Sequence, residues 1–249
     1  SQLHAVDGIN LKIYPGETLG VVGESGCGKS TLGRTILRLQ EPTDGQILYD
    51  GKDITKYNRR QMKQMRQNMQ LIFQDPYASL DPRKSVVEII AEYMIINRTY
   101  PSKKEIYNYA AHLMDIVGLA RRYANAYPHE LDGGRRQRIG IARALSLHPK
   151  FIVCDEPVSA LDVSIQAQIL NLLMDLQDEM NLTYMFVTHD LSVVKHISNH
   201  IMVMYLGQCL ELSTSDELFK RPLHPYTQAL LSAIPEPDIS MRNKEFRVK

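Results

Sequence analysis

Short apolar runs alternate with segments of helical periodicity along much of the chain. The runs lie at residues 19–22, 69–73, 151–154 and 184–187, and their length is typical of buried strands. Strands that alternate with helices are typical of a mainly parallel sheet whose two faces are both covered. The pattern therefore predicts an α/β fold with a parallel or mixed sheet at its core.

Helices are predicted where apolar residues recur at steps of three and four, most clearly at residues 165–180. Shorter helical patterns lie at 31–39, 106–117 and 226–234. Because strand-like runs are missing from about 76 to 147, we expect a helical subdomain inserted into a single domain of residues 1–249. A proline-rich tail is expected from about 214 to 249. The chain starts at Ser1 in a strand-like pattern, so we expect the sequence to be trimmed there and incomplete at both ends.

The composition is typical of a globular protein and argues against several other classes of protein. Its 249 residues are 44% hydrophobic and 23% charged, with a net charge of +1. Without a basic excess, nucleic acid is not expected as the main ligand. A local basic run is therefore predicted to be a solvated face; it comprises Arg59, Arg60, Lys63 and Arg66. The neighbouring Met62, Met65 and Met69 recur at helical spacing and are predicted to be core or interface residues.

No apolar run approaches the roughly 18–20 residues that a membrane span requires, so we expect a chain that does not cross a membrane by itself. Three widely spaced cysteines fit neither a disulfide framework nor a paired zinc site, which favours a reducing compartment.

The most specific chemical motif follows the apolar run at 19–22 and matches the pattern G-x-x-x-x-G-K-[ST]. Glycines allow backbone N–H groups to surround phosphates, and the following helix presents its positive end to them. We expect Lys29 to bridge the β- and γ-phosphates of ATP and Ser30 to hold Mg²⁺. A glycine-rich turn without a ligand is the alternative. The expected phosphate-binding residues are Gly23, Glu24, Ser25, Gly26, Cys27, Gly28, Lys29, Ser30 and Thr31.

Four polar residues follow the other predicted strands. Asp155 and Glu156 come after 151–154, Gln74 after 69–73 and His189 after 184–187. Ligands bind at the carboxyl edge of open parallel sheets, where the phosphate loop also lies. We therefore expect Asp155 to reach Mg²⁺ and Glu156 to activate water, with Gln74 and His189 near the γ-phosphate. Taken singly, each residue has a structural alternative, such as helix capping for the Asp-Glu pair.

Two further motifs make the chain resemble ABC ATPases. Residues 131–138 read Leu-Asp-Gly-Gly-Arg-Arg-Gln-Arg and resemble the signature motif L-S-G-G-Q, and residues 159–162 resemble the D-loop. Gln74 then falls at the Q-loop and His189 at the switch histidine. Within this superfamily, the runs 5–9, 20–31, 74–82 and 224–231 are similar to ATPase subunits of bacterial oligopeptide and dipeptide importers. Residues 33–39 and 41–45 resemble the F-type subunit, and the similarity covers essentially the whole chain.

The resemblance implies a phosphate-loop NTPase (ABC ATPase) fold that binds ATP and Mg²⁺. It implies a head-to-tail pair with a second ABC ATPase subunit, in which ATP lies between the phosphate loop of one and the signature of the other. Glu156 would be the general base, His189 would contact the γ-phosphate, and Gln74 would be a catalytic and metal contact. The trans-site residues would be Asp132, Gly133, Gly134, Arg135 and Asp162.

Further partners follow from the same resemblance. Two transmembrane permease subunits would dock on the helical insertion and the segment after Gln74, and a solute-binding protein would act indirectly. The implied location is peripheral, at the cytoplasmic face of the bacterial membrane. The family's adenine-stacking aromatic would fall upstream of Ser1, and the Cys-rich iron–sulfur segment of some relatives would follow the C-terminus.

Two residues depart from the signature pattern: Asp132 replaces its serine and Arg135 its glutamine. A carboxylate about 4 Å from a phosphate charge is repelled by roughly 4 kcal/mol at an effective dielectric near 20, more than the roughly 0.3–1 kcal/mol that a helix N-terminus offers it. Asp132 is therefore expected to be protonated, turned away or paired with Arg135 or Arg136. Either it is simply the N-cap of a helix starting near Gly134, or it belongs to a heterodimer with one weak ATP site.

Other functions stay open at this point. A soluble ABC ATPase acting on nucleic acid or ribosomes is one, although such proteins commonly carry two cassettes or long coiled-coil inserts. A regulatory subunit that binds ATP without driving transport is another, and a simple phosphate-loop kinase leaves residues 131–138 without a purpose. Importers of peptides, nickel, glutathione and some sugars share this type of ATPase, so the cargo is not fixed.

Overall fold

A six-stranded sheet occupies the centre of the computed structural model, which describes residues 4–233. The strand order is β4-β5-β6-β1-β7-β8; the first five strands run parallel and β8 runs antiparallel to β7. The predicted α/β class with a mixed sheet is confirmed. The bounds are β1 Thr18–Val22, β4 Met69–Ile72, β5 Phe151–Asp155, β6 Thr183–Val187, β7 His200–Tyr205 and β8 Gln208–Thr214.

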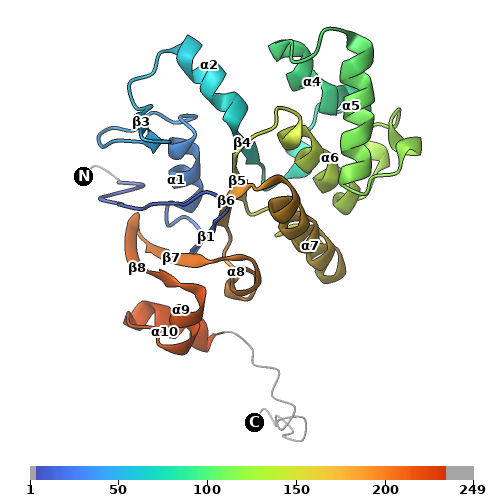
Figure 1. The fold of residues 1–249 in the computed structure, drawn as a ribbon. Helices are drawn as coiled ribbons and strands as arrows, with labels where there is room; N and C mark the ends of the chain where they lie inside the picture. The colour runs from blue at the N-terminus through green and yellow to red at the C-terminus, as the bar shows by residue number, and fades with distance from the viewer. Residues whose placement is uncertain (1–3, 234–249) are drawn as a thin grey trace, which may run out of the picture.

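Alternate residues of each strand point to opposite faces, so the sheet separates two hydrophobic cores. Phe151 and Val153 of β5 face the core that α1 (Lys29–Ile36) and α2 (Arg59–Asn68) cover. Ile152 and Cys154 face the larger core, which α6 (Gly133–Leu145), α7 (Val163–Met180) and α8 (Leu191–Ile197) cover. Figure 1 shows α1 and α6 on opposite sides of the strands.

The chain between β4 and β5 is helical, as the missing strand-like runs predict. It contains α3 (Pro76–Ser79), α4 (Val86–Asn97), α5 (Lys103–Ile116), two 3₁₀ turns (Arg121–Tyr123 and Pro128–Glu130) and α6. Buried side chains at helical spacing on α5, such as Ala110, Leu113 and Met114, join these helices to the larger core. The helices drawn in green in Figure 1 gather beside the sheet.

The basic run lies on α2 with its charged side chains exposed, as predicted, while Met62 and Met69 are buried at 3% exposure each. Near α2, β2 (Leu48–Tyr49) and β3 (Lys52–Asp53) form a separate antiparallel pair.

Two local predictions are wrong. The described part of the N-terminal segment, residues 4–14, forms no strand: Gly8 has φ 59°, which interrupts an extended chain, and Val6, Ile9, Leu11 and Ile13 merely pack on the α1 side. The tail holds two helices where one was predicted, α9 (Ser215–Lys220) and α10 (Pro225–Ser232). The first begins because the Thr214 side chain caps it. The rest of the predicted tail, from 234, lies outside the described residues.

Adjacent positions on α7 provide a test of this packing. Leu173 is fully buried in the larger core, whereas Met174 is 37% exposed. Leu173→Ala should lower the free energy of unfolding by about 2–5 kcal/mol, because it leaves a cavity in the core. Met174→Ala should change it by no more than about 0.5 kcal/mol. Equilibrium urea unfolding measures both, and equal effects would contradict the assigned face of α7.

Candidate functional site

The phosphate loop connects the buried strand β1 to helix α1 through two glycines that no other residue could replace without strain. Gly28 is the N-cap of α1 with φ 102°, and a Cβ there would lie 2.1 Å from the carbonyl oxygen of Ala5. A Cβ on Gly23, with φ 151°, would lie 2.2 Å from the carbonyl oxygen of Met204. The loop is thus folded tightly against two neighbouring backbones, and its N–H groups precede a helix N-terminus.

Lys29 is held inside this loop and is only 4% exposed. Its Nζ donates to the carbonyl oxygens of Gly23 at 2.7 Å and Glu24 at 2.8 Å. The Cys27 Sγ lies 3.8 Å from the same nitrogen. The ammonium group therefore sits where the loop curves, the position from which it could reach a phosphate bound there.

A hydroxyl–carboxylate pair lies between α1 and β5. Ser30 Oγ donates to Asp155 Oδ1 at 2.6 Å, and Asp155 is 3% exposed. Hydroxyl and carboxylate oxygens are ligands of the kind that Mg²⁺ takes, together with phosphate oxygens and waters. Arg34 Nη2 lies 3.6 Å from Asp155 Oδ2. Sequence reasoning missed Arg34, although its spacing of four residues from Ser30 on one helix places both on the same side.

Three predicted residues from three different strand ends meet beside this pair. Gln74 Nε2 donates to Glu156 Oε2 at 3.0 Å, and His189 Nδ1 lies 3.4 Å from the same oxygen. The Glu156 side chain is 15% exposed and that of His189 is 58% exposed, so the carboxylate is sheltered and the imidazole faces outward. Glu156 has φ 47°, which costs a residue other than glycine about 1–3 kcal/mol and is common at functional sites.

The signature-like segment begins α6. Asp132 is the N-cap: its Oδ1 accepts the backbone N–H of Arg135 at 2.8 Å, and its Oδ2 pairs with the guanidinium of Arg135. Asp132 is therefore the N-cap that the sequence suggested and is also paired with Arg135, one of the ways in which its charge was expected to be offset. The helix starts at Gly133, one residue before the predicted Gly134.

The D-loop-like segment and the first turn of α7 pack against the two glycines at the start of α6. A Cβ on Gly133 would lie 3.1 Å from Leu161 Cδ2, and one on Gly134 would lie 2.7 Å from Ile165 Cγ2. Asp162 is exposed at the start of α7, and its side chain has no partner within residues 4–233. The signature and D-loop segments thus form one continuous surface on the α6–α7 side of the sheet.

Comparison with known proteins identifies the family. The family model described as "ABC transporter" matches residues 6–159, which include the phosphate loop, Gln74, the signature-like segment, Asp155 and Glu156. This chain belongs to the ABC transporter family. A second model, "Oligopeptide/dipeptide transporter, C-terminal region", matches residues 210–247.

Relatives within the ABC transporter family align over nearly the whole chain. The oligopeptide transport ATP-binding protein OppF of Bacillus subtilis (strain 168) is 55% identical over 98% of this chain and 81% of its own length. OppF of Salmonella typhimurium is 54% identical over 99% of this chain and 74% of its own length. The dipeptide transport ATP-binding protein DppF of Escherichia coli (strain K12) is 53% identical over 93% of this chain and 69% of its own length.

Solved structures of ABC cassettes share the fold. The cassette MJ0796, in a dimeric post-hydrolysis state bound to ADP and Pi, matches with a TM-score of 0.77 at 30% identity, covering 85% of this chain and 90% of that one. CbiO1 of Clostridium perfringens, part of the ABC transporter complex CbiONQ, matches with a TM-score of 0.79 at 29% identity, covering 87% and 84%. The predicted ABC ATPase fold and the resemblance to peptide-importer ATPases are confirmed.

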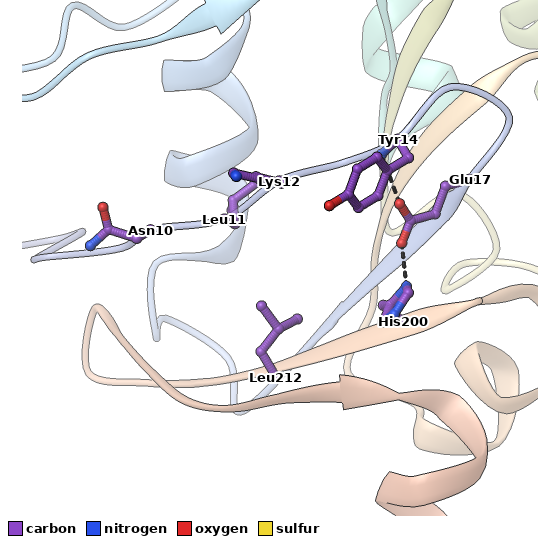
Figure 2. Close-up of a pocket in the computed structure, with 7 residues that line it drawn as sticks. All are labelled: Asn10, Leu11, Lys12, Tyr14, Glu17, His200 and Leu212. Carbon is purple, nitrogen blue, oxygen red and sulfur yellow. Dashed lines mark hydrogen bonds and ion pairs between the residues drawn. The ribbon is translucent and has the colours of Figure 1, made fainter.

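The cavity shown in Figure 2 is not the phosphate site of this ABC ATPase. It measures about 450 Å³ and includes Tyr14, Glu17 and His200 in its lining. Glu17 accepts the Tyr14 N–H at 2.7 Å, and its other oxygen lies 2.5 Å from His200 Nδ1. Glu17 precedes β1 whereas the phosphate loop follows it, so β1 separates the two by roughly 17 Å at about 3.3 Å per residue. Its carboxylate, Glu17, is held by these two structural contacts, and none of the predicted site residues lines the cavity.

Two glycines of the phosphate loop test its conformation. Gly28→Ala should lower the free energy of unfolding by about 2–4 kcal/mol, because the new Cβ meets the Ala5 backbone and φ is positive. Gly26→Ala, also at positive φ but with no atom within 4 Å of its Cβ, should cost only about 1–2 kcal/mol. Urea unfolding of both variants measures the difference. A smaller effect for Gly28→Ala than for Gly26→Ala would contradict the tight packing of the loop.

Proposed function

We propose that this chain is the subunit that binds and hydrolyses ATP to power an ABC importer of oligopeptides or dipeptides. The observation that carries the proposal is the cluster of Gln74, Glu156 and His189, which lies beside Ser30 and Asp155 at the sheet edge that bears the phosphate loop. The names of the relatives and the match of residues 210–247 support peptides as cargo. Importers of nickel, glutathione or sugars remain the alternative.

The proposed roles follow from the contacts. The loop N–H groups and Lys29 would bind the phosphates, and Ser30 and Asp155 would hold Mg²⁺, with Gln74 proposed as a further metal contact. Bound there, Mg²⁺ would neutralise negative charge on the β- and γ-phosphates. Within residues 4–233 no group of three or more His, Cys, Asp and Glu side chains could hold a metal, which fits an ion that takes phosphates and waters as its other ligands.

Glu156 is the proposed general base. Its Oε2 accepts the Gln74 amide and lies next to His189, so the carboxylate is fixed in direction and can take a proton from the attacking water. His189 is 58% exposed on its side chain and is proposed to contact the γ-phosphate. Attack by water at the γ-phosphorus would release ADP and phosphate.

A second ABC ATPase subunit is proposed to complete the site. Because α1 and α6 cover opposite faces of the sheet, the phosphate loop and the segment of Asp132 to Arg135 do not face each other within one chain. A head-to-tail pair would bring the signature of each subunit to the loop of the other, with Asp162 at the joint. The dimeric state of the MJ0796 cassette supports this arrangement.

We further propose one ABC nucleotide-binding domain over 1–249, with a helical subdomain at about 76–147 and a tail from about 214. Two transmembrane permeases would dock on that subdomain and the segment after Gln74, where Phe73 and Tyr77 are 37% and 57% exposed. A solute-binding protein would act indirectly, and no nucleic acid is expected.

No helix in the described part of the chain could span a membrane. Docking on the permeases would place the chain peripherally, at the cytoplasmic face of a bacterial membrane.

Glu156→Gln tests the general base. The amide keeps the size of the side chain but accepts no proton, so ATP turnover in the assembled transporter should fall at least about 100-fold while ATP binding persists. Glu179→Gln is the matched control, because Glu179 is exposed on α7 away from the strand ends. Robust hydrolysis by Glu156→Gln would remove Glu156 from the role of base.

Asp132→Asn and Asp132→Ser test whether the partner's ATP faces a weakened signature. Asn and Ser are both good N-cap residues, so α6 should still begin at Gly133 while the negative charge at position 132 is lost. ATP turnover of the assembled transporter should rise roughly fivefold if about 1 kcal/mol of repulsion is removed. Unchanged turnover in both variants would end the hypothesis of unequal sites, since Arg135 would then already offset the charge.

A further inference from the structure

The start of helix α10 is fixed to the edge strand of the sheet. Glu211 on β8 accepts the backbone N–H of Leu223 at 2.9 Å and of His224 at 3.0 Å. The His224 side chain then caps the helix by accepting the N–H of Tyr226 at 3.1 Å. Burial raises the pKa of Glu211, but these N–H donors, together with the Thr227 hydroxyl and the His224 side chain, outweigh it and leave that pKa below its ordinary value. The first turn of α10 is therefore held in one place.

That first turn delivers the Tyr226 ring toward the phosphate loop. The ring packs on Tyr205, the last residue of β7, with centroids 4.8 Å apart. Two residues later, in the turn between β7 and β8, the Gly207 N–H donates to the Cys27 carbonyl of the loop at 2.9 Å. The loop, the turn and α10 are thus in continuous contact.

The Tyr226 hydroxyl is buried and has no hydrogen-bond partner within residues 4–233. The backbone N–H and the carboxylate of Glu24 lie near enough to the hydroxyl to influence its pKa, as does the thiol of Cys27, but neither Glu24 group makes a hydrogen bond of normal geometry with it. Burial above all raises the pKa of Tyr226, so the group is neutral and retains its proton to donate. A buried hydroxyl without a partner is costly, which points to a contact that forms in another state of the loop.

The Glu24 carbonyl accepts two hydrogen bonds within the loop, from Lys29 Nζ at 2.8 Å and from the Cys27 N–H at 3.3 Å. A phosphate in the loop would draw Lys29 away from that carbonyl, because the ammonium group favours the anion. Glu24 would then keep only the longer hydrogen bond from the Cys27 N–H and would be held less firmly. The hydroxyl of Tyr226 is placed to supply a new one.

We propose that Tyr226 is a positioning residue for ATP binding, whose hydroxyl holds Glu24 and so couples the C-terminal helix α10 to the phosphate loop. The inference rests on the proposed nucleotide site and adds to it a contribution from the C-terminal region. Tyr226 acts through Glu24 and touches no reacting atom. Its loss should weaken ATP binding without slowing the hydrolytic step.

The test is Tyr226→Phe, which removes only the hydroxyl. In the full chain assembled with its partners, the KM for ATP and the Kd for MgATP should rise about three- to tenfold, as expected for one hydrogen bond, while kcat at saturating ATP stays unchanged. Tyr205→Phe keeps the ring contact and is the matched control, with both constants unchanged. An unaltered Kd in Tyr226→Phe, or a fall in kcat alone, would overturn the proposal.

Two additional variants separate the possible failures. In Glu24→Ala the further change Tyr226→Phe should raise the Kd by less than about twofold, because the carboxylate that accepts the hydroxyl is gone; a full three- to tenfold rise there would overturn action through Glu24. Lys29→Ala tests the site itself: if it binds MgATP like the unaltered chain, the proposed nucleotide site is wrong, and with it this inference. The thermal midpoint of Tyr226→Phe without nucleotide should be equal to or higher than that of the unaltered chain, because the substitution removes a buried hydroxyl without a partner. A large drop would assign the hydroxyl a structural role instead.

Discussion

The parallel pairing of β4, β5, β6 and β1 is the constraint on which the site depends. Its register sets Val21 of β1 and Asp155 of β5 level with Val187 of β6. Residues just past that level, on four separate segments, therefore emerge at one edge. A slip of one residue in any pair would turn the following side chains to the other face and separate them. The register is specified because both faces of these strands are buried in hydrophobic cores.

Functional groups at this edge are held by contacts that already satisfy part of their hydrogen bonding. Lys29 donates to loop carbonyls, Ser30 donates to Asp155, and Gln74 donates to Glu156. Such mutual contacts keep each group oriented at little cost, since a buried ammonium or carboxylate without a partner would be strongly destabilising. The positive φ of Glu156 is stabilised in a similar way. Its backbone N–H donates to the Val187 carbonyl and fixes the strained residue.

The two faces of the sheet separate the two halves of the proposed ATP site. One face carries α1 and the phosphate loop. The other carries α6 and α7, where Gly133 packs on the D-loop segment and Gly134 on the first turn of α7. Asp132 serves the second face in two ways, as the N-cap of α6 and as the partner of Arg135. Both contacts are local to the first turn of the helix, which is why a carboxylate is compatible with the fold at a position where the family pattern has serine.

The amino-acid sequence by itself determined the strands before each functional residue, the phosphate loop and the N-cap role of Asp132, because these depend on apolar runs, fixed spacing and neighbours within a few residues. It did not reveal β7 and β8 or the contact of Arg34 with Asp155. It also suggested a strand at the N-terminus, where Gly8 interrupts the extended chain. Only the tertiary structure decided that Gln74 and His189 share one oxygen of Glu156, and that Tyr226 approaches Glu24. Those contacts join residues up to about 200 positions apart, so they are set by sheet register and by the docking of α10, which no local pattern encodes.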